Sequence, residues 1–131
     1  MQLKRDSDYA FRVLHHMEEQ DGRDGSFRGL SISELSRGAG IPRRSAERIC
    51  GYLVKGQILK ESTADNGMMF EKGERWDSAS FLDVIKATEG STDLFAIFDR
   101  KHKAYKENER ILGEMGNKAR EALSYLKVRN I

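Results

Sequence analysis

Arginine residues concentrate in the segment 37–60, and their side chains are the ones in the chain best suited to bind a polyanion. The segment holds six basic residues and one acidic residue, namely Arg37, Arg43, Arg44, Arg48, Lys55, Lys60 and Glu47. Its net charge is +5, whereas the whole chain of 131 residues carries +2 and the rest of it −3. A basic segment within a mildly acidic chain is typical of an element that faces a nucleic acid. A solvated helix face without a ligand is the alternative interpretation.

The apolar residues of this segment recur at helical spacing, at Ala46, Ile49, Cys50 and Leu53, and predict a helix that begins after Pro42. The other face of that helix carries the polar residues Arg43, Arg44, Glu47 and Arg48. An arginine near the start of a helix can bind a guanine edge with both prongs of its guanidinium, while serine hydroxyls and helix N-termini bind phosphates. The segment therefore predicts a helix that binds double-stranded DNA.

Length and composition exclude several classes of protein. A chain of 131 residues suffices for one domain, and its 38% hydrophobic and 34% charged residues suit amphipathic helices. Cys50 is the only cysteine, which excludes an intrachain disulfide and a cysteine-rich zinc or iron–sulfur site. No nucleophile elbow, phosphate loop, paired-carboxylate motif or metal triad occurs, so we expect no enzyme, no cofactor and no metal. Since the sequence has neither an apolar run of about 18 residues nor a secretory leader, we expect a cytoplasmic protein without a membrane partner.

Periodicity and turn residues predict the elements before the basic helix. An apolar stripe over 9–17 predicts a first helix that ends in the glycine-containing turn 21–25. Ser31 and Glu34 form a capping-box pattern that predicts a short helix over 33–37, which the segment 38–40 ends. Two helices joined by a tight glycine-containing turn are typical of a helix-turn-helix.

A small hairpin and a further helix are predicted after the basic helix. Strands over 58–62 and 68–71 flank the segment 63–67, in which Asn66-Gly67 favours a hairpin turn. A helix over 80–88 follows, and its predicted inward residues are Phe81, Leu82, Val84 and Ile85. The fold class is therefore mainly α: a winged helix-turn-helix with a small β-hairpin wing.

The C-terminal part is predicted to form a long helix with an apolar seam. The seam steps by three and four residues, through Tyr105, Leu112, Met115, Ala119, Ala122 and Leu126. Gly113 and Gly116 each weaken a helix interior by about 1 kcal/mol relative to alanine. Because few residues remain to cover such a seam, we expect it to pack against a partner. We divide the chain into a DNA-binding domain over 1–90 and a dimerisation region over 91–131.

Several segments together resemble the Rrf2 family of dimeric winged-helix transcription regulators. They are Gln2-Leu3-Lys4 through Asp8-Tyr9-Ala10, the turn from Ser33-Glu34-Leu35 to Gly40-Ile41, Glu47 in the second helix, and the run from Ser80 to Gly90. The resemblance implies a homodimer whose second helices enter successive major grooves of a pseudo-palindromic operator. By position it implies DNA contacts from Lys4, Arg5, Ser33, Arg43, Arg44, Ser45, Glu47 and Arg48.

The sequence also departs from the family pattern. Many members hold an iron–sulfur cluster through three cysteines before the long helix, whereas the segment 92–108 has none, which excludes a cluster sensor of that type. Typical members also insert a wing arginine into the minor groove. The segment 64–70 occupies that place here without an arginine, and Lys72 and Arg75 are the nearest substitutes.

Other side chains have an ordinary interpretation beside a functional one. Cys50 lies on the apolar face of its helix, which favours a small hydrophobic residue over a redox sensor. His15, His16 and His102 lack metal-ligand spacing, so we expect ordinary histidines rather than pH sensors or ligands. Trp76, with the apolar residues 68–70, either fixes the wing by packing or lines a small-molecule pocket.

Two functions from different classes remain. The first is a sequence-specific, DNA-binding transcription regulator that acts as a homodimeric repressor, with room for a small-molecule effector. The second is a protein-interaction module that keeps the winged-helix shape without reading DNA, which the small net charge and the atypical wing favour. Binding that falls steeply with salt would separate the two.

Overall fold

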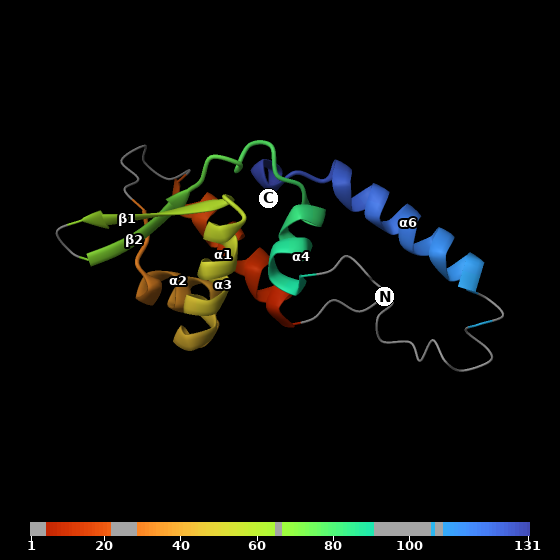
Figure 1. The fold of residues 1–131 in the computed structure, drawn as a ribbon. Coiled ribbons are helices and arrows are strands. Elements are labelled where there is room, and N and C mark those ends of the chain that lie inside the picture. The colour runs from red at the N-terminus through yellow and green to blue at the C-terminus, as the bar shows by residue number, and fades with distance from the viewer. Residues whose placement is uncertain (1–4, 22–28, 65–66, 91–105, 107–108) are drawn as a thin grey trace.

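The computed structural model describes residues 5–21, 29–64, 67–90, 106 and 109–131. Its elements are α1 (Arg5–Asp21), α2 (Ile32–Ala39), α3 (Arg43–Lys55), β1 (Leu59–Ala64), β2 (Gly67–Lys72), α4 (Phe81–Glu89), α6 (Glu109–Tyr125) and a short 3-10 helix, η1 (Val128–Asn130). Helices α1 to α4 pack together, the hairpin projects from one side of them, and α6 extends from the opposite side (Figure 1). The predicted mainly α winged helix-turn-helix is confirmed.

Helix α1 lies at the centre because its apolar stripe faces the other helices. Ala10, Val13, Leu14 and Met17 are fully buried, as the spacing predicts. They contact the inward residues of α3, among them Ile49 and Leu53, in one core cluster. Burying such side chains stabilises the fold by about 1.5–3 kcal/mol each relative to their exposed state.

The turn between α2 and α3 gives the two helices their relative position. Gly40 ends α2 in the left-handed conformation (φ 68°), which glycine adopts without steric cost. Ser36 donates a hydrogen bond of 2.6 Å from its hydroxyl to the Ile41 carbonyl and so closes the turn. Pro42 directly precedes α3, where its missing N–H leaves no helical hydrogen bond unmade.

The wing is a two-stranded antiparallel hairpin. The strands pair from Leu59 opposite Lys72 to Ala64 opposite Gly67, so the turn is shorter than the predicted 63–67. Phe70 is buried, and its backbone exchanges two hydrogen bonds of 2.8 Å with Leu30, which joins the wing to the segment before α2. These two bonds fix the hairpin to the rest of the chain near the middle of β2.

Helix α4 begins at a complete capping box. The Ser80 hydroxyl accepts from the Asp83 amide at 3.2 Å, and the Asp83 carboxylate accepts from the Ser80 amide at 2.9 Å. At the predicted box before α2, by contrast, only the bond from the Glu34 amide to Ser31 is made. Of the residues predicted to face inward on α4, Val84 and Ile85 are buried.

The C-terminus returns to the helical body. Val128 is fully buried in the core, and its amide donates to the Ala79 carbonyl at 3.0 Å. The chain beyond α6 also pairs with the start of α4, through a bridge between Ser80 and Lys127. No helix among the described residues is both long and apolar enough to span a membrane.

Candidate nucleic-acid interface

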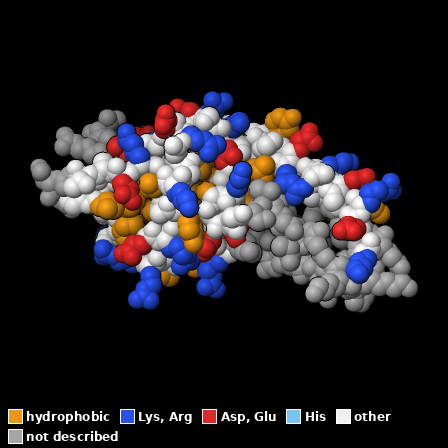
Figure 2. Space-filling model, viewed as in Figure 1, with side chains coloured by type: hydrophobic (Ala, Val, Ile, Leu, Met, Phe, Trp, Pro, Cys, Tyr) orange, Lys and Arg blue, Asp and Glu red, His pale blue; other side chains and the backbone are white. Residues whose placement is uncertain are grey.

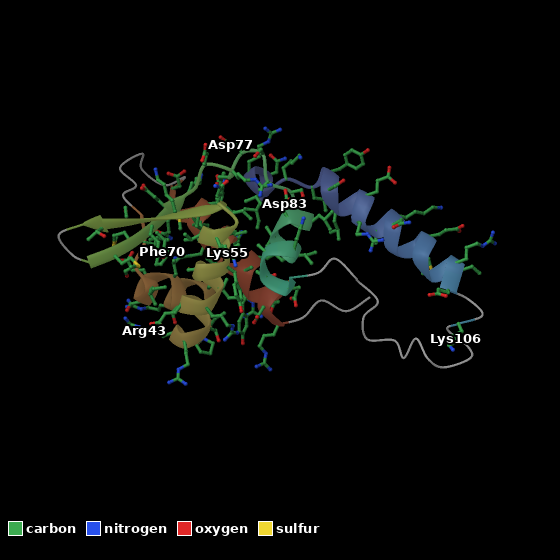
Figure 3. All side chains as sticks on the ribbon, in the orientation of Figure 1. Arg43, Lys55, Phe70, Asp77, Asp83 and Lys106 are labelled. Carbon is green, nitrogen blue, oxygen red and sulfur yellow. The ribbon has the colours of Figure 1, made fainter. Side chains whose placement is uncertain are left out.

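The polar face of α3 projects its three arginines away from the core. Arg43, Arg44 and Arg48 are all exposed, while the opposite face of α3 is buried against α1 and α4. Figure 3 shows Arg43 at the outer end of α3, and Figure 2 shows Lys and Arg side chains protruding along the same lower edge of the molecule. The basic face predicted from the sequence therefore lies at the surface.

Arg43 is held in a cluster that joins α2 to α3. Its Nη1 donates to the Ser33 hydroxyl at 3.0 Å, and its Nε lies 3.5 Å from Glu47 Oε1. The structure thus brings together three of the predicted DNA-binding residues. Arg43 and Ser33 can donate hydrogen bonds to a phosphate or a base edge. The Glu47 carboxylate beside them repels an anion that approaches from its side.

Arg48 is bound on its inner side by the first turn of α1. Its Nη2 lies 2.7 Å from the Asp6 carboxylate. The hydrogen bond and the negative charge of Asp6 raise the pKa of Arg48 above the ordinary arginine value, so its guanidinium stays charged. The ion pair uses one nitrogen of the guanidinium, and 42% of the Arg48 side chain stays exposed.

Arg44 differs from both neighbours because it has no hydrogen bond or ion pair with any residue that the structure describes. It lies one turn before Arg48, beside the half-buried Ser45. Arg5 is exposed at the start of α1, whereas Lys4 lies outside the described residues. Among the three arginines of α3, Arg44 is therefore the one most available to a ligand.

The wing carries no uncommitted basic side chain. Its two lysines are in ion pairs: Lys60 lies 3.5 Å from Glu71, and Lys72 lies 2.7 Å from Glu18 and 2.5 Å from Asp21. Partial burial lowers the pKa of Lys72, but the two carboxylates outweigh it and leave the pKa above the ordinary lysine value. The segment 59–72 has a net charge of −1, from two lysines against three acidic residues.

The two predicted substitutes for a wing arginine both make contacts within the protein. The Lys72 ammonium also lies 5.0 Å from the centre of the Trp76 ring. Arg75 lies 3.1 Å from Asp83 and donates to the Gly56 carbonyl at 3.3 Å. Trp76 is 3% exposed, as packing requires, whereas Met68 near the tip is 52% exposed. The described residues of the wing thus expose an apolar side chain and leave no cation free for the minor groove.

Cys50 is buried on the apolar face of α3. Burial raises the pKa of its thiol to about 12, and Glu61 adds to the shift. The reactive thiolate is therefore scarce at neutral pH. The hydrophobic interpretation of this residue fits its environment.

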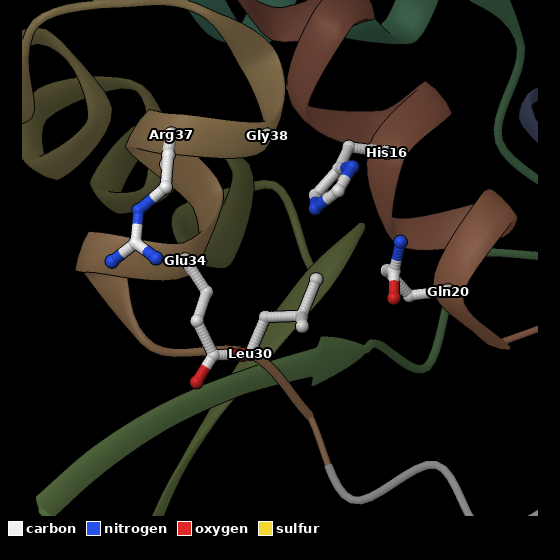
Figure 4. Close-up of a pocket in the computed structure, with 6 residues that line it drawn as sticks. All are labelled: His16, Gln20, Leu30, Glu34, Arg37 and Gly38. Atoms are coloured by element: carbon white, nitrogen blue, oxygen red, sulfur yellow. The ribbon is translucent and has the colours of Figure 1, made fainter.

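A small pocket of about 250 Å³ opens between α1 and α2, lined by His16, Gln20, Leu30, Glu34, Arg37 and Gly38 (Figure 4). The His16 ring packs directly over Gly38, where an added Cβ would lie 2.1 Å from Nε2. A side chain at position 38 would therefore require the His16 ring to move. His16 Nδ1 lies 3.8 Å from Glu19, and the described residues contain no group of three or more side chains that could hold a metal.

Helix α6 covers α4 with part of its apolar surface and leaves the rest open. Met115 and Leu126, both predicted at the dimer seam, are 51% and 49% exposed, and Ile111 is 49% exposed. Ala122 is exposed and Ala119 half-buried. Tyr105 lies outside the described residues, and the side chain of Leu112 is not described. Apolar residues at this spacing form one uncovered stripe along α6.

The fold is that of a winged helix-turn-helix protein. Helices α2 and α3 form the helix-turn-helix, β1 and β2 form the wing, and α1 packs against α2 and α3. Solved structures share this fold over nearly the whole chain. CymR of Staphylococcus aureus in its oxidised form matches with a TM-score of 0.71 and 13% identity, covering 98% of this chain and 94% of that chain. CymR of B. subtilis, described as a global cysteine regulator, matches with a TM-score of 0.72 and 13% identity, covering 98% and 93%.

IscR of T. potens matches with a TM-score of 0.69 and 12% identity, covering 98% of this chain and 83% of that chain. These neighbours are Rrf2-family winged-helix regulators, so the predicted resemblance is confirmed at the level of the fold. No protein-family model matches the sequence, and no curated protein matches it either.

Proposed function

We propose that this chain is a transcription regulator that binds a specific DNA sequence through α3. The observation that carries the proposal is the outward row of Arg43, Arg44 and Arg48 on the second helix of a helix-turn-helix, within a segment of net charge +5. In this fold the second helix enters the major groove with its N-terminal residues against base edges. Arginine is the side chain that binds guanine most specifically there.

The roles of the α3 side chains follow from their contacts. Arg44 is unpaired among the described residues and is proposed to bind base edges. Arg43, held by Ser33 and Glu47, is proposed to bind a phosphate near the start of α3. Lys4, Arg5 and Ser45 are proposed as further phosphate contacts, which fix orientation without reading sequence.

We further propose that the protein acts as a homodimer and represses by occupying a promoter. The uncovered apolar stripe of α6, with Met115, Ala122 and Leu126, supports the homodimer because a lone chain would leave it in water. Two α3 helices related by a twofold axis would match a pseudo-palindromic operator with half-sites about 34 Å apart. The cytoplasmic location, the small-molecule effector and the division at residue 90 stay predictions.

A second function, a protein-interaction module, has one observation in its favour. The wing is acidic and exposes Met68, which suits a protein surface better than a phosphate backbone. The arginines of α3 favour DNA, because three exposed guanidinium groups on the second helix of a helix-turn-helix suit a phosphate backbone and base edges.

Selection from a random-sequence duplex library tests the proposed function. The full chain should enrich a pseudo-palindromic sequence, and the Arg43→Ala/Arg44→Ala variant should bind that duplex at least about tenfold more weakly. The Arg110→Ala/Arg129→Ala variant removes the same charge from exposed positions far from α3 and serves as the control. The proposal fails if no sequence is enriched, and the assignment to α3 fails if both variants bind like the wild type.

A further inference from the structure

Two neighbouring residues in the first turn of α1 connect the helix to different elements. Asp6 reaches outward to Arg48 on α3, whereas Ser7 is fully buried and faces α4. The Ser7 hydroxyl donates to Glu89 Oε1 at 2.7 Å and lies 3.0 Å from the Thr88 hydroxyl. The first turn of α1 is thus fixed from the inside by α4 while its carboxylate holds an arginine of the DNA-binding face.

The backbone strengthens this attachment. The Ser7 amide donates to Glu89 Oε1 at 3.2 Å, at the end of α1 where amides have no partner within the helix. A carboxylate at a helix N-terminus also interacts favourably with the helix dipole. The position of Asp6 is therefore set by the packing of α1 on α4 and not by solvent.

The contact between Asp6 and Arg48 has a cost for DNA binding. Asp6 is an acidic side chain beside a surface that must approach phosphates, so its charge weakens binding to every duplex alike. In return its carboxylate, with 27% of the side chain exposed, restrains one edge of a guanidinium whose side chain is 42% exposed. A restrained guanidinium meets a base or phosphate in one orientation only, which favours the matching sequence.

We propose that Asp6 is a positioning residue that orients Arg48 for sequence recognition, and that it lowers affinity for non-matching duplexes in the same act. This inference rests on the proposed DNA-binding function and adds to it a residue outside the helix-turn-helix. The first turn of α1 would therefore contribute to sequence specificity, although the negative charge of Asp6 by itself opposes DNA binding.

Asp8 supplies a matched control. It lies one position beyond Ser7 on the same exposed turn, but its carboxylate pairs with Arg12 of α1 at 2.9 Å and not with α3. Asp6→Asn and Asp8→Asn remove the same charge from the same helical turn, but from different faces of α1. Only the first removes a charged contact with the DNA-binding face.

The experiment measures two dissociation constants for the full chain: one for the duplex most enriched by the wild type from a random library, and one for a scrambled duplex of equal composition. The specificity ratio is the dissociation constant for the scrambled duplex divided by that for the selected duplex. Asp6→Asn should reduce this ratio by about fivefold or more, since it weakens a charge-assisted contact that fixes a guanidinium. Asp8→Asn should tighten both duplexes alike and leave the ratio unchanged. In an Arg48→Ala background, Asp6→Asn should no longer alter the ratio.

The outcomes separate the two proposals. If the wild type selects no duplex, the proposed function fails and this inference with it. If the wild type does select one, but Asp6→Asn changes both constants alike as Asp8→Asn does, the positioning role alone is overturned. Should Asp6→Asn not fold, Arg48→Lys keeps the charge but loses the guanidinium fork, and an unchanged ratio in that variant overturns the role as well.

Discussion

Arg43, Arg44 and Arg48 lie on one face of one helix, yet their surroundings differ. Arg43 contacts Ser33 and Glu47, Arg48 contacts Asp6, and Arg44 has no partner among the described residues. A side chain already held by protein groups loses less entropy on binding but has fewer free donors. At the scale of single residues, the three arginines are therefore not interchangeable.

Arg44→Ala is expected to lose about 1–3 kcal/mol of affinity for the selected duplex and to relax base preference at one position of each half-site. Titration against a set of single-base variants of that duplex measures both effects. Lys4→Ala should instead weaken all duplexes alike, because a phosphate contact carries no sequence information. Equal losses on every duplex for Arg44→Ala would show that this side chain does not read bases.

The Cys50 thiol should resist modification in the folded protein. Its pKa of about 12 keeps it protonated at pH 8, and its side chain has no access to solvent. A disulfide reagent should react slowly with the native chain and at the ordinary rate in guanidinium chloride. Because the folded pKa lies above the unfolded one, this group should also lower stability as pH rises from about 9 toward 12. Rapid modification of the native chain would contradict the account.

At the scale of elements, the caps before α2 and α4 differ in completeness. Ser80 and Asp83 exchange both bonds of the capping box, whereas Ser31 receives only one, from Glu34. Asp83 also forms an ion pair with Arg75. Burial raises the pKa of the Asp83 carboxyl, but its hydrogen bonds with Ser80 and its contact with Arg75 lower the pKa by more, so the pKa lies below the usual value. Helix α4 thus begins at a better defined point than α2.

Ser80→Ala should therefore cost more stability than Ser31→Ala. We expect about 1–2 kcal/mol for Ser80→Ala, because an interlocked and buried cap is lost, and about 0.5–1 kcal/mol for Ser31→Ala. Urea unfolding monitored by circular dichroism gives both free energies of unfolding. The reverse order of the two losses would contradict this interpretation of the caps.

The elements that periodicity and turn residues mark were predictable from the sequence. The stripe of Val13, Leu14 and Met17, the break at Gly40 and the hairpin signal Asn66-Gly67 each have a local physical cause. The corresponding helices and strands form, with α1 beginning four residues before the predicted stripe and Gly67 already lying in β2. The box at Ser80 follows the same local rule, a serine three residues before an acidic side chain, and this pattern could have identified it.

Contacts between distant segments were not predictable in the same way. The pairs of Lys72 with Glu18 and Asp21, and of Arg48 with Asp6, join residues dozens of positions apart. The burial of Val128 likewise depends on where the chain after α6 returns. No local pattern encodes such contacts, because they follow from how the helices pack. The exposed face of α3 and the local pair of Arg43 with Glu47 were predictable, but the partner of Arg48 was not.

At the scale of the whole molecule, charge and apolar surface lie at different places. The basic face lies on α3 and the wing projects beside it, whereas α6, which carries the uncovered apolar stripe, extends from the opposite side (Figure 1). This separation suits a protein that pairs with a second copy through one end and binds DNA through the other. The two surfaces can therefore be altered independently.

Met115→Glu is expected to convert the proposed homodimer to a monomer, since it places a charge in the middle of the apolar stripe. Asn117→Glu, an exposed position on the opposite side of α6, is the control and should stay dimeric. Sedimentation equilibrium at micromolar concentration measures both masses. A wild-type monomer, or a dimeric Met115→Glu variant, would contradict the proposed interface.

The salt dependence of duplex binding is the measurement that tests DNA binding through α3 most directly. For the wild type, the logarithm of the binding constant should fall linearly and steeply with the logarithm of salt concentration, because bound arginines release counterions from the phosphates. The Arg43→Ala/Arg44→Ala variant should bind with a slope smaller by about two to four units, counted over both subunits. A binding constant that does not change with salt, or equal slopes for the two proteins, would contradict the account.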